Sequence, residues 1–131
     1  MIRNVLVVCI GNICRSPYGE YVLRDLAQKA NAETRFSSAG LGALVGNPAD
    51  PEVTSLALRE GLDLSDHRAR QFSRDLGANA DLILVMEARH RRDILAIALL
   101  YHQIRVLFDI PQLGRVGKYH HLALAGPQLV Q

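Results

Sequence analysis

The chain has 131 residues, of which 49% are hydrophobic and 21% charged, a composition typical of one globular domain and not of a disordered chain. Its formal net charge of +2 and its few aromatic residues, three Phe and four Tyr, argue against a nucleic-acid binder that works by charge and base stacking. Its longest strongly apolar run, 94–101, is far shorter than the ~20 residues of a membrane-spanning helix. We expect a cytoplasmic protein with one domain over 1–131, no nucleic-acid partner and no membrane insertion.

Strands and helices alternate from the beginning of the chain. Residues 5–9 form a short, β-branched apolar run that is typical of a strand buried on both faces. Ser16 and Pro17 are a typical N-cap and first helical residue, and apolar residues at helical spacing then predict a helix over 17–30. A second strand is predicted over 34–38, followed by a glycine-containing turn.

The same alternation continues further along the chain. Asp50, followed by proline, repeats the cap signature, and its helix is predicted to end at Gly61. An apolar strand over 81–86, a helix over 88–100 and a last strand over 105–108 complete the pattern. Strands that alternate with helices predict an α/β fold with a parallel sheet and right-handed crossovers. In such sheets, ligands bind beyond the carboxyl ends of the strands.

The segment between the first strand and the first helix is the most informative part of the sequence. It reads CIGNICRS from Cys9 to Ser16, which is the pattern C-x5-R-S. A loop of this length can curl around one tetrahedral anion, with backbone N–H groups pointing inward and the helix N-terminus behind it. Gly11 and Asn12 tolerate the positive φ angles that the curl requires. The alternative, that Cys9 is an ordinary buried residue at a strand end, is disfavoured by this context.

Three side chains of the loop suit phosphate chemistry. The positive field of the loop favours the nucleophilic thiolate form of Cys9. Arg15 can offer a bidentate fork to two phosphate oxygens. The hydroxyl of Ser16 can donate to the sulfur of Cys9 and ease its departure when a phosphocysteine is hydrolysed.

This loop and four further segments resemble the low-molecular-weight protein tyrosine phosphatases, most of all the bacterial members. The resemblance covers residues 3 to about 108, and the matching segments are VVCIGNICRSP at 7–17, SSAG at 37–40, NPADP at 47–51, DHRARQ at 66–71 and DLILVME at 81–87. It implies a three-layer αβα domain with a four-stranded parallel sheet. The phosphate-binding loop would connect the first strand to the first helix.

The resemblance also implies roles for individual residues. Cys9 matches the nucleophile and Arg15 the phosphate-binding arginine. The implied phosphate-binding residues are Ile10, Gly11, Asn12, Ile13, Cys14, Arg15 and Ser16, and the network that supports the loop comprises Asn12, Ser16, Ser38 and His67. We expect no cofactor and no metal, and inorganic phosphate or sulfate can occupy the loop.

The substrate implied by the resemblance is a protein that carries phosphotyrosine. Ile13 favours this substrate, because relatives that act on phosphoarginine have Thr at the matching position. Leu41 and Leu44 match residues that line the substrate cleft of the family. Bacterial members are often partnered with tyrosine kinases that control capsule or exopolysaccharide production, so a bacterial tyrosine kinase is the expected partner.

The chain departs from the family pattern at its C-terminal end. The family takes its general acid from an Asp-Pro pair near the C-terminus, and no such pair occurs here after position 50. Asp109 is the only carboxylate after Asp93 and is therefore the candidate acid, although the usual register places Gln112 nearer to that position. Segment 109–131 is thus atypical, and truncation, frameshift and natural divergence are all left open. Because general acid catalysis contributes about 10²–10⁴-fold, we predict slow phosphotyrosine turnover but better retained activity on p-nitrophenyl phosphate.

Two other functions compete with a tyrosine phosphatase that has an impaired general-acid step. One is a catalytically weak module that binds phosphotyrosine or another oxyanion. The other is an arsenate reductase, which is disfavoured because no cysteine follows Cys14 to carry a disulfide relay. Cys14 itself allows two interpretations: a reversible disulfide with Cys9 that protects the nucleophile, or a structural thiol.

Overall fold

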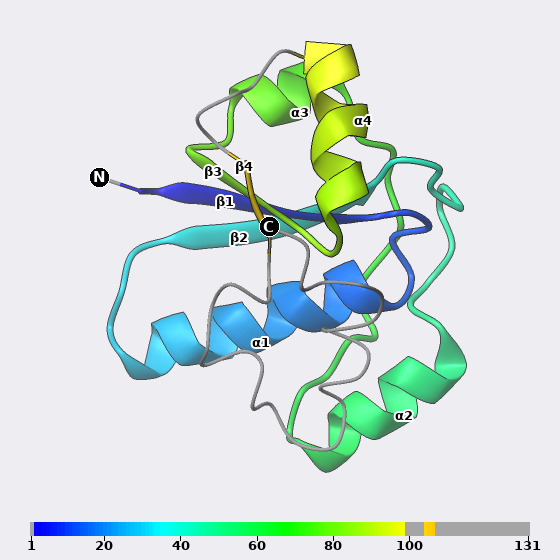
Figure 1. Ribbon diagram of the computed structural model, residues 1–131. Coiled ribbons are helices and arrows are strands. Elements are labelled where there is room, and N and C mark those ends of the chain that lie inside the picture. Colours follow the sequence, from blue (N-terminus) through cyan, green and yellow to red (C-terminus); the bar gives the residue numbers. More distant parts are fainter. Residues whose placement is uncertain (1, 99–103, 107–131) are drawn as a thin grey trace.

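A computed structural model describes residues 2–98 and 104–106 (Figure 1). The described strands form one four-stranded sheet in the order β2-β1-β3-β4, and every neighbouring pair is parallel. The strands are β1 Asn4–Cys9, β2 Arg35–Gly40, β3 Leu82–Val85 and β4 Ile104–Val106. Because the strands run in one direction, their carboxyl ends share one edge of the sheet, where β1 ends at Cys9.

Helices cover both faces of this sheet, as Figure 1 shows. One face carries α1 and α2, and the other carries α3 and α4. Their bounds are α1 Arg15–Lys29, α2 Pro51–Arg59, α3 Arg74–Ala78 and α4 Ala88–Ala98. The predicted three-layer α/β fold with a parallel sheet is therefore confirmed. No helix in the described part of the chain has the length and apolar character needed to cross a membrane.

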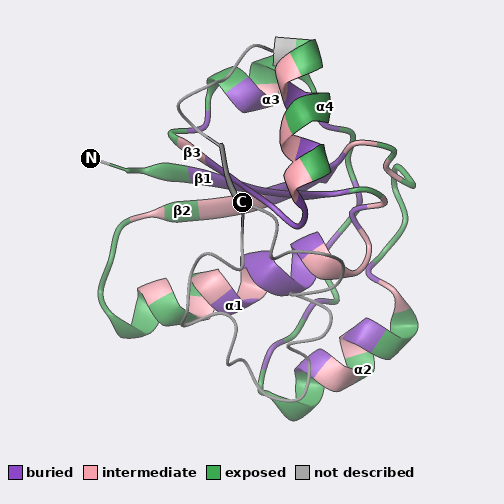
Figure 2. Cartoon of the chain, viewed as in Figure 1, coloured by how far each residue is buried: buried purple, intermediate pink, exposed green. Residues whose placement is uncertain are grey.

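The central strand β1 is apolar without interruption because both of its faces are covered. Val5, Val7 and Cys9 face one core cluster, which includes side chains from α1 and α2. Leu6 and Val8 face a second cluster, which includes Ile94 from α4. All five positions are at most 4% exposed, and Figure 2 shows β1 as buried along most of its length between the helices. This two-sided burial anchors the residue that begins the C-x5-R-S loop.

The prediction that Ser16 caps a helix beginning at residue 17 is wrong. Helix α1 begins at Arg15, with Cys14 in the cap position and no side-chain cap. The Ser16 hydroxyl is not available as a cap because it contacts Cys9 and Asn12 inside the loop. Pro17 is tolerated in the first turn, where helical N–H groups have no intrahelical partner.

Two further differences arise from contacts between distant segments. Strand β2 extends through Ala39 and Gly40, which were predicted as a turn, because they pair with Val8 and Cys9 of β1. Helix α3 was not predicted; it is only five residues long, and Ser73 caps it by accepting from Leu76 N at 3.2 Å. Helix α2 follows its prediction: Asp50 Oδ1 accepts from the backbone of residues 52 and 53, and Gly61 has φ +81°.

Several predictions lie outside the described residues. They concern residues 99–100 of the predicted helix, 107–108 of the last predicted strand, and the segment 109–131 with Asp109 and Gln112. These predictions, and the assignment of 1–131 to one domain, stay predictions.

Asp81 joins the beginnings of β1 and β3 and makes a pH-dependent contribution to stability. Its Oδ2 accepts from Arg3 N at 2.8 Å and Asn4 N at 2.9 Å, and these bonds lower the pKa of its carboxyl from the ordinary 3.8. A carboxyl with a lowered folded pKa stabilises the fold above its unfolded pKa, and this stabilisation is lost as pH falls through the folded value. We expect Asp81→Asn to lower the Tm at pH 7, with the difference from wild type shrinking below pH 3.8.

Thermal unfolding at pH 7 and at pH 2–3 measures this effect. Glu33→Gln is the matched control, since Glu33 is exposed and has no side-chain partner among the described residues. An Asp81→Asn deficit that is the same at both pH values would contradict the role of the carboxylate.

Candidate active site

The loop 10–14 lies at the carboxyl edge of the sheet, between the end of β1 and the beginning of α1. Cys9, the last residue of β1, is 3% exposed, and Arg15 is the first residue of α1. Within the loop, Asn12 has φ 58°, a left-handed conformation that asparagine adopts more readily than most residues. The predicted positive φ angle is therefore confirmed at Asn12, whereas Gly11 does not adopt one and that part of the prediction is wrong.

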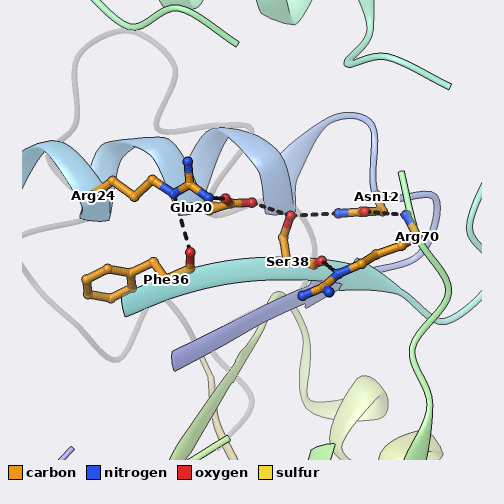
Figure 3. Close-up of polar contacts among 6 residues, drawn as sticks. All are labelled: Asn12, Glu20, Arg24, Phe36, Ser38 and Arg70. Carbon is orange, nitrogen blue, oxygen red and sulfur yellow. Dashed lines mark hydrogen bonds and ion pairs between the residues drawn. The ribbon is translucent and has the colours of Figure 1, made fainter. Parts of the chain in front are cut away.

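Asn12 is the centre of a buried hydrogen-bond network. Its Nδ2 donates to Ser16 Oγ at 2.8 Å and to Ser38 Oγ at 3.0 Å. Its Oδ1 accepts from Arg70 N at 2.9 Å, and its backbone oxygen lies 2.7 Å from His67 Nε2. The structure thus brings together the four residues predicted to support the loop, and it adds the backbone of Arg70, which sequence reasoning missed. Figure 3 shows Asn12 between Ser38 and Arg70.

A second set of bonds turns the carbonyl groups of the loop outward. Residues that follow β2 donate their backbone N–H groups to the carbonyl of Cys9 and to three carbonyls of the loop. The bonds are Leu41 N to Cys9 O, Gly42 N to Ile10 O, Leu44 N to Gly11 O and Asp50 N to Ile13 O, at 2.8–3.1 Å. Within the described ranges, by contrast, no protein group accepts from the N–H groups of 11–14. Unpaired N–H groups that converge in a loop form an anion-binding nest.

Gly40 allows this close packing between β2 and the loop. A Cβ atom at Gly40 would lie 2.3 Å from the Ile10 carbonyl oxygen and 3.0 Å from Asn12 N. Both neighbours are backbone atoms, so a side chain here would displace the loop itself. Position 40, which was predicted to lie in a turn, is therefore the last residue of β2, and it is glycine because the loop backbone leaves no room for a side chain.

The sulfur of Cys9 lies 2.8 Å from Ser16 Oγ in a buried contact in which either atom can donate. When the thiol is ionised, only the hydroxyl carries a proton to donate, so Ser16 stabilises the thiolate. Cys14 is also a free thiol, and burial, followed by the nearby Asp50 and Cys9, raises its pKa from the ordinary 9.0. Cys14 therefore keeps its proton at neutral pH, and both interpretations of its role stay predictions.

Arg15 is held by a carboxylate to which sequence reasoning assigned no role. Arg15 Nη1 lies 3.2 Å from Glu87 Oε1, and Arg89 Nε lies 2.9 Å from Glu87 Oε2. Glu87 is 9% exposed and lies two residues after the end of β3. Its position after a buried strand, at the same edge as Cys9, was the signal that could have identified it. The carboxylate restrains the guanidinium beside the loop and balances its charge.

His90, in the first turn of α4, lies behind this ion-paired cluster. It is 0% exposed, and neither ring nitrogen has a hydrogen-bond partner among the residues that the structure describes. Burial, reinforced by the charges of Arg15 and Arg89 and opposed by those of Glu87 and Asp93, lowers its pKa from the ordinary 6.5. His90 is therefore a core residue, because α4 turns this position toward the core.

The remaining predicted residues surround the mouth of the loop. Ile10 is 41% exposed and Leu44 49% exposed, while Leu41 is half-buried. Ile13 is half-buried in the loop wall. Asp109, the candidate acid, lies outside the described residues. In the described part of the chain, no group of three His, Cys, Asp or Glu residues is arranged to hold a metal ion.

The sequence matches the family "Low molecular weight phosphotyrosine protein phosphatase" over residues 4–118. The chain belongs to this family. It is 54% identical over 90 residues to the low molecular weight protein-tyrosine-phosphatase Wzb of Escherichia coli K12, which covers 69% of this chain and 58% of Wzb. It is 48% identical over 96 residues to the probable phosphatase EpsP of Ralstonia solanacearum, covering 73% of this chain and 63% of EpsP. The chain thus spans less than two thirds of the length of these relatives.

Solved structures agree with the family assignment. The tyrosine phosphatase AmsI of Erwinia amylovora superposes with a TM-score of 0.77 at 40% identity, covering 82% of this chain and 69% of AmsI. Wzb of Vibrio vulnificus in complex with benzylphosphonate gives a TM-score of 0.77 at 33% identity, covering 88% of this chain and 76% of that Wzb. Wzb of Escherichia coli K30 in complex with sulphate gives a TM-score of 0.74 at 40% identity, covering 82% of this chain and 73% of that Wzb.

A substitution at Ser38 tests whether the buried hydrogen bonds around Asn12 stabilise the protein. Its hydroxyl donates to Glu20 Oε1 at 2.6 Å and accepts from Asn12 Nδ2 at 3.0 Å. Ser38→Ala would deprive two buried polar groups of a partner, so we expect the free energy of unfolding to fall by about 1–3 kcal/mol. Denaturant unfolding measures the loss. The control is Ser37→Ala, half-buried and without a side-chain bond among the described residues, and equal losses in both variants would contradict this role.

Proposed function

We propose that this protein hydrolyses phosphotyrosine in proteins through a phosphocysteine intermediate. The observation that carries the proposal is the loop geometry: a buried Cys9 sulfur at a strand end, 2.8 Å from the Ser16 hydroxyl, in a loop whose carbonyl groups are turned outward. The N–H groups left without protein partners in the described residues can receive a phosphate dianion. Family membership and the phosphatase names of the relatives support the same reaction.

In the first step, the Cys9 thiolate attacks phosphorus, and a P–S bond forms as the P–O bond to the phenol breaks. The phenolate takes a proton from a general acid as it leaves. Negative charge on the equatorial oxygens is stabilised by the N–H groups of the loop and by the guanidinium of Arg15. Glu87, 3.2 Å from Arg15 Nη1, serves as a positioning residue that orients this guanidinium.

In the second step, water attacks the phosphocysteine and the P–S bond breaks. The electron pair returns to Cys9, and the Ser16 hydroxyl stabilises the departing thiolate at 2.8 Å. Inorganic phosphate then leaves the loop. The two steps together consume one water molecule, and their atoms and electrons balance without an oxidant, metal or cofactor. Asp109 is the proposed acid in the first step and the base that activates water in the second.

The proposal also includes a preference for phosphotyrosine and a partner protein. The apolar side chains of Ile10 and Leu44, both exposed at the loop, can pack against the ring of a phosphotyrosine, and Ile13 favours the same substrate. The likeness to bacterial members supports a bacterial tyrosine kinase of capsule or exopolysaccharide production as the cytoplasmic partner. The alternative of a catalytically weak binding module finds no support in the comparisons, because the relatives carry the names of phosphatases.

Stopped-flow hydrolysis of p-nitrophenyl phosphate tests the nucleophile. We expect the wild-type chain to release p-nitrophenol and to form an acid-stable phosphoenzyme, and Cys9→Ser to do neither, because a serine hydroxyl is not ionised at neutral pH. Cys14→Ser should still form the phosphoenzyme, since position 14 contributes only its backbone N–H to the nest. Phosphoenzyme in Cys9→Ser, or its absence in wild type, would overturn the proposal.

Asp109→Asn tests the general acid. A phenolate with a high pKa needs protonation as it leaves, whereas p-nitrophenolate does not. We therefore expect kcat for phosphotyrosine to fall by about 10²-fold or more, with a much smaller loss in the first step with p-nitrophenyl phosphate. Single-turnover rates with both esters separate the two effects. Equal rates in wild type and Asp109→Asn with both esters would exclude Asp109 as the acid.

A further inference from the structure

A polar cavity lies beside Ser38 and His67, two residues that contact Asn12 of the phosphate loop. It is open to solvent, has a volume of about 260 Å³ and is lined by residues of α1, β2 and the segment 66–70. The residues of its wall that matter here are three arginines and the groups around them: Arg24, Arg68, Arg70, Glu20, Asp66 and Tyr21. None of these residues takes part in the proposed hydrolysis.

The charges in the cavity wall leave a net positive balance. Glu20 is 4% exposed, and both of its oxygens are occupied, Oε1 by the Ser38 hydroxyl at 2.6 Å and Oε2 by the guanidinium of Arg24. Figure 3 shows this pairing along α1. Arg68 and Arg70 remain, and among the described residues of the wall the only other carboxylate is that of Asp66. The two guanidiniums therefore exceed the remaining negative charge by one.

The two arginines also have hydrogen-bond donors to spare. Arg70 Nε donates to Ser38 O at 2.9 Å, and Arg68 Nη1 donates to Ser65 O and His67 O at 3.0 and 2.6 Å. These bonds orient both side chains. Among the described residues, nothing accepts from Nη1 and Nη2 of Arg70 or from Nε and Nη2 of Arg68. Oriented guanidiniums with free donors are the groups that recognise phosphate oxygens.

Tyr21 adds a neutral donor to the same wall. Its ring lies 4.7 Å from Arg24 Cζ, which fixes the ring against the helix. Burial, together with the charge of Glu20, raises the pKa of its hydroxyl above the ordinary 10.0. The hydroxyl therefore keeps its proton at neutral pH and can donate to an anion.

We propose that this cavity is a second phosphate-binding site, distinct from the catalytic loop, that recognises free inorganic phosphate or the phosphate group of a larger ligand. The site adjoins the catalytic loop through shared walls. Ser38 and His67 line the cavity, and both contact Asn12 of the loop. An anion that binds Arg70 would therefore stabilise the support of the catalytic loop. This inference does not depend on the proposed hydrolysis, because it concerns binding alone.

The experiment is calorimetric titration of the full chain with inorganic phosphate at constant ionic strength, with chloride as the balancing ion. We expect two sites in wild type, one at the catalytic loop and one in the cavity. Arg68→Gln should weaken the second site by about tenfold or more, since it removes charge-assisted hydrogen bonds. Asp66→Asn should tighten the second site by about threefold, because it removes the opposing charge.

Arg59→Gln is the matched control, since Arg59 is an exposed arginine of α2 that does not line the cavity. It should keep both sites at wild-type affinity. A single site in wild type, or a second site weakened equally by Arg68→Gln and Arg59→Gln, would overturn the proposal. If Arg68→Gln fails to fold, Asp66→Asn still decides, because unchanged or weaker second-site binding there contradicts the charge argument.

A second arm with phenylphosphonate, which cannot be hydrolysed by this route, distinguishes the ligand sources. Two sites for both probes would show that the cavity takes a phosphate group on a larger ligand. Two sites for inorganic phosphate and one for phenylphosphonate would show a site for the free ion. Neither probe is hydrolysed, so these titrations measure binding alone. A chain that binds two phosphate groups but does not hydrolyse p-nitrophenyl phosphate would refute the proposed hydrolysis and leave this inference standing.

Discussion

The backbone of Asn12, held at φ 58°, is the constraint on which the rest of the site depends. A left-handed conformation costs an ordinary L-residue about 1–2 kcal/mol, and the buried carboxamide needs partners for each of its polar atoms. Both requirements are met from outside the loop. Ser16 and Ser38 accept from its Nδ2, and the backbone of Arg70 donates to its Oδ1. The loop therefore keeps its shape only where α1, β2 and the segment around Arg70 meet.

Buried charge reinforces this arrangement on both sides of the loop. On one side, Glu20 receives the Ser38 hydroxyl and the Arg24 guanidinium, so a carboxylate that is 4% exposed has a partner for each oxygen. On the other side, Glu87 lies between Arg15 and Arg89. A buried carboxylate without partners is strongly destabilising, so each pair restrains the element that carries it. The C-x5-R-S loop and the Arg15 side chain at its end are thereby restrained by contacts within the protein itself.

The strands and long helices were predictable because their signals are local. The apolar run at 5–9 matches a strand covered on both faces, and Asp50 with its following proline marks the beginning of α2 where the structure has it. The errors occurred where distant contacts decide. Ser16 has the sequence preference of a cap, but its hydroxyl contacts the sulfur of Cys9. Ala39 and Gly40 resemble a turn, but they pair with β1, and α3 is too short to show a helical period.

For this protein, the sequence alone determined the fold class, the position of the C-x5-R-S loop between a strand and a helix, and the family, because apolar periodicity and the spacing of this motif are properties of neighbouring residues. The tertiary structure decided which side chains complete the site. Arg70 and Glu20 carry no local signal of a role, since their partners Asn12 and Ser38 lie 58 and 18 residues away along the chain. Glu87 has only its place after a buried strand as a signal, and its partner Arg15 lies 72 residues away. Only the packing of α1 and of the 66–71 segment around the sheet brings these groups within hydrogen-bond distance.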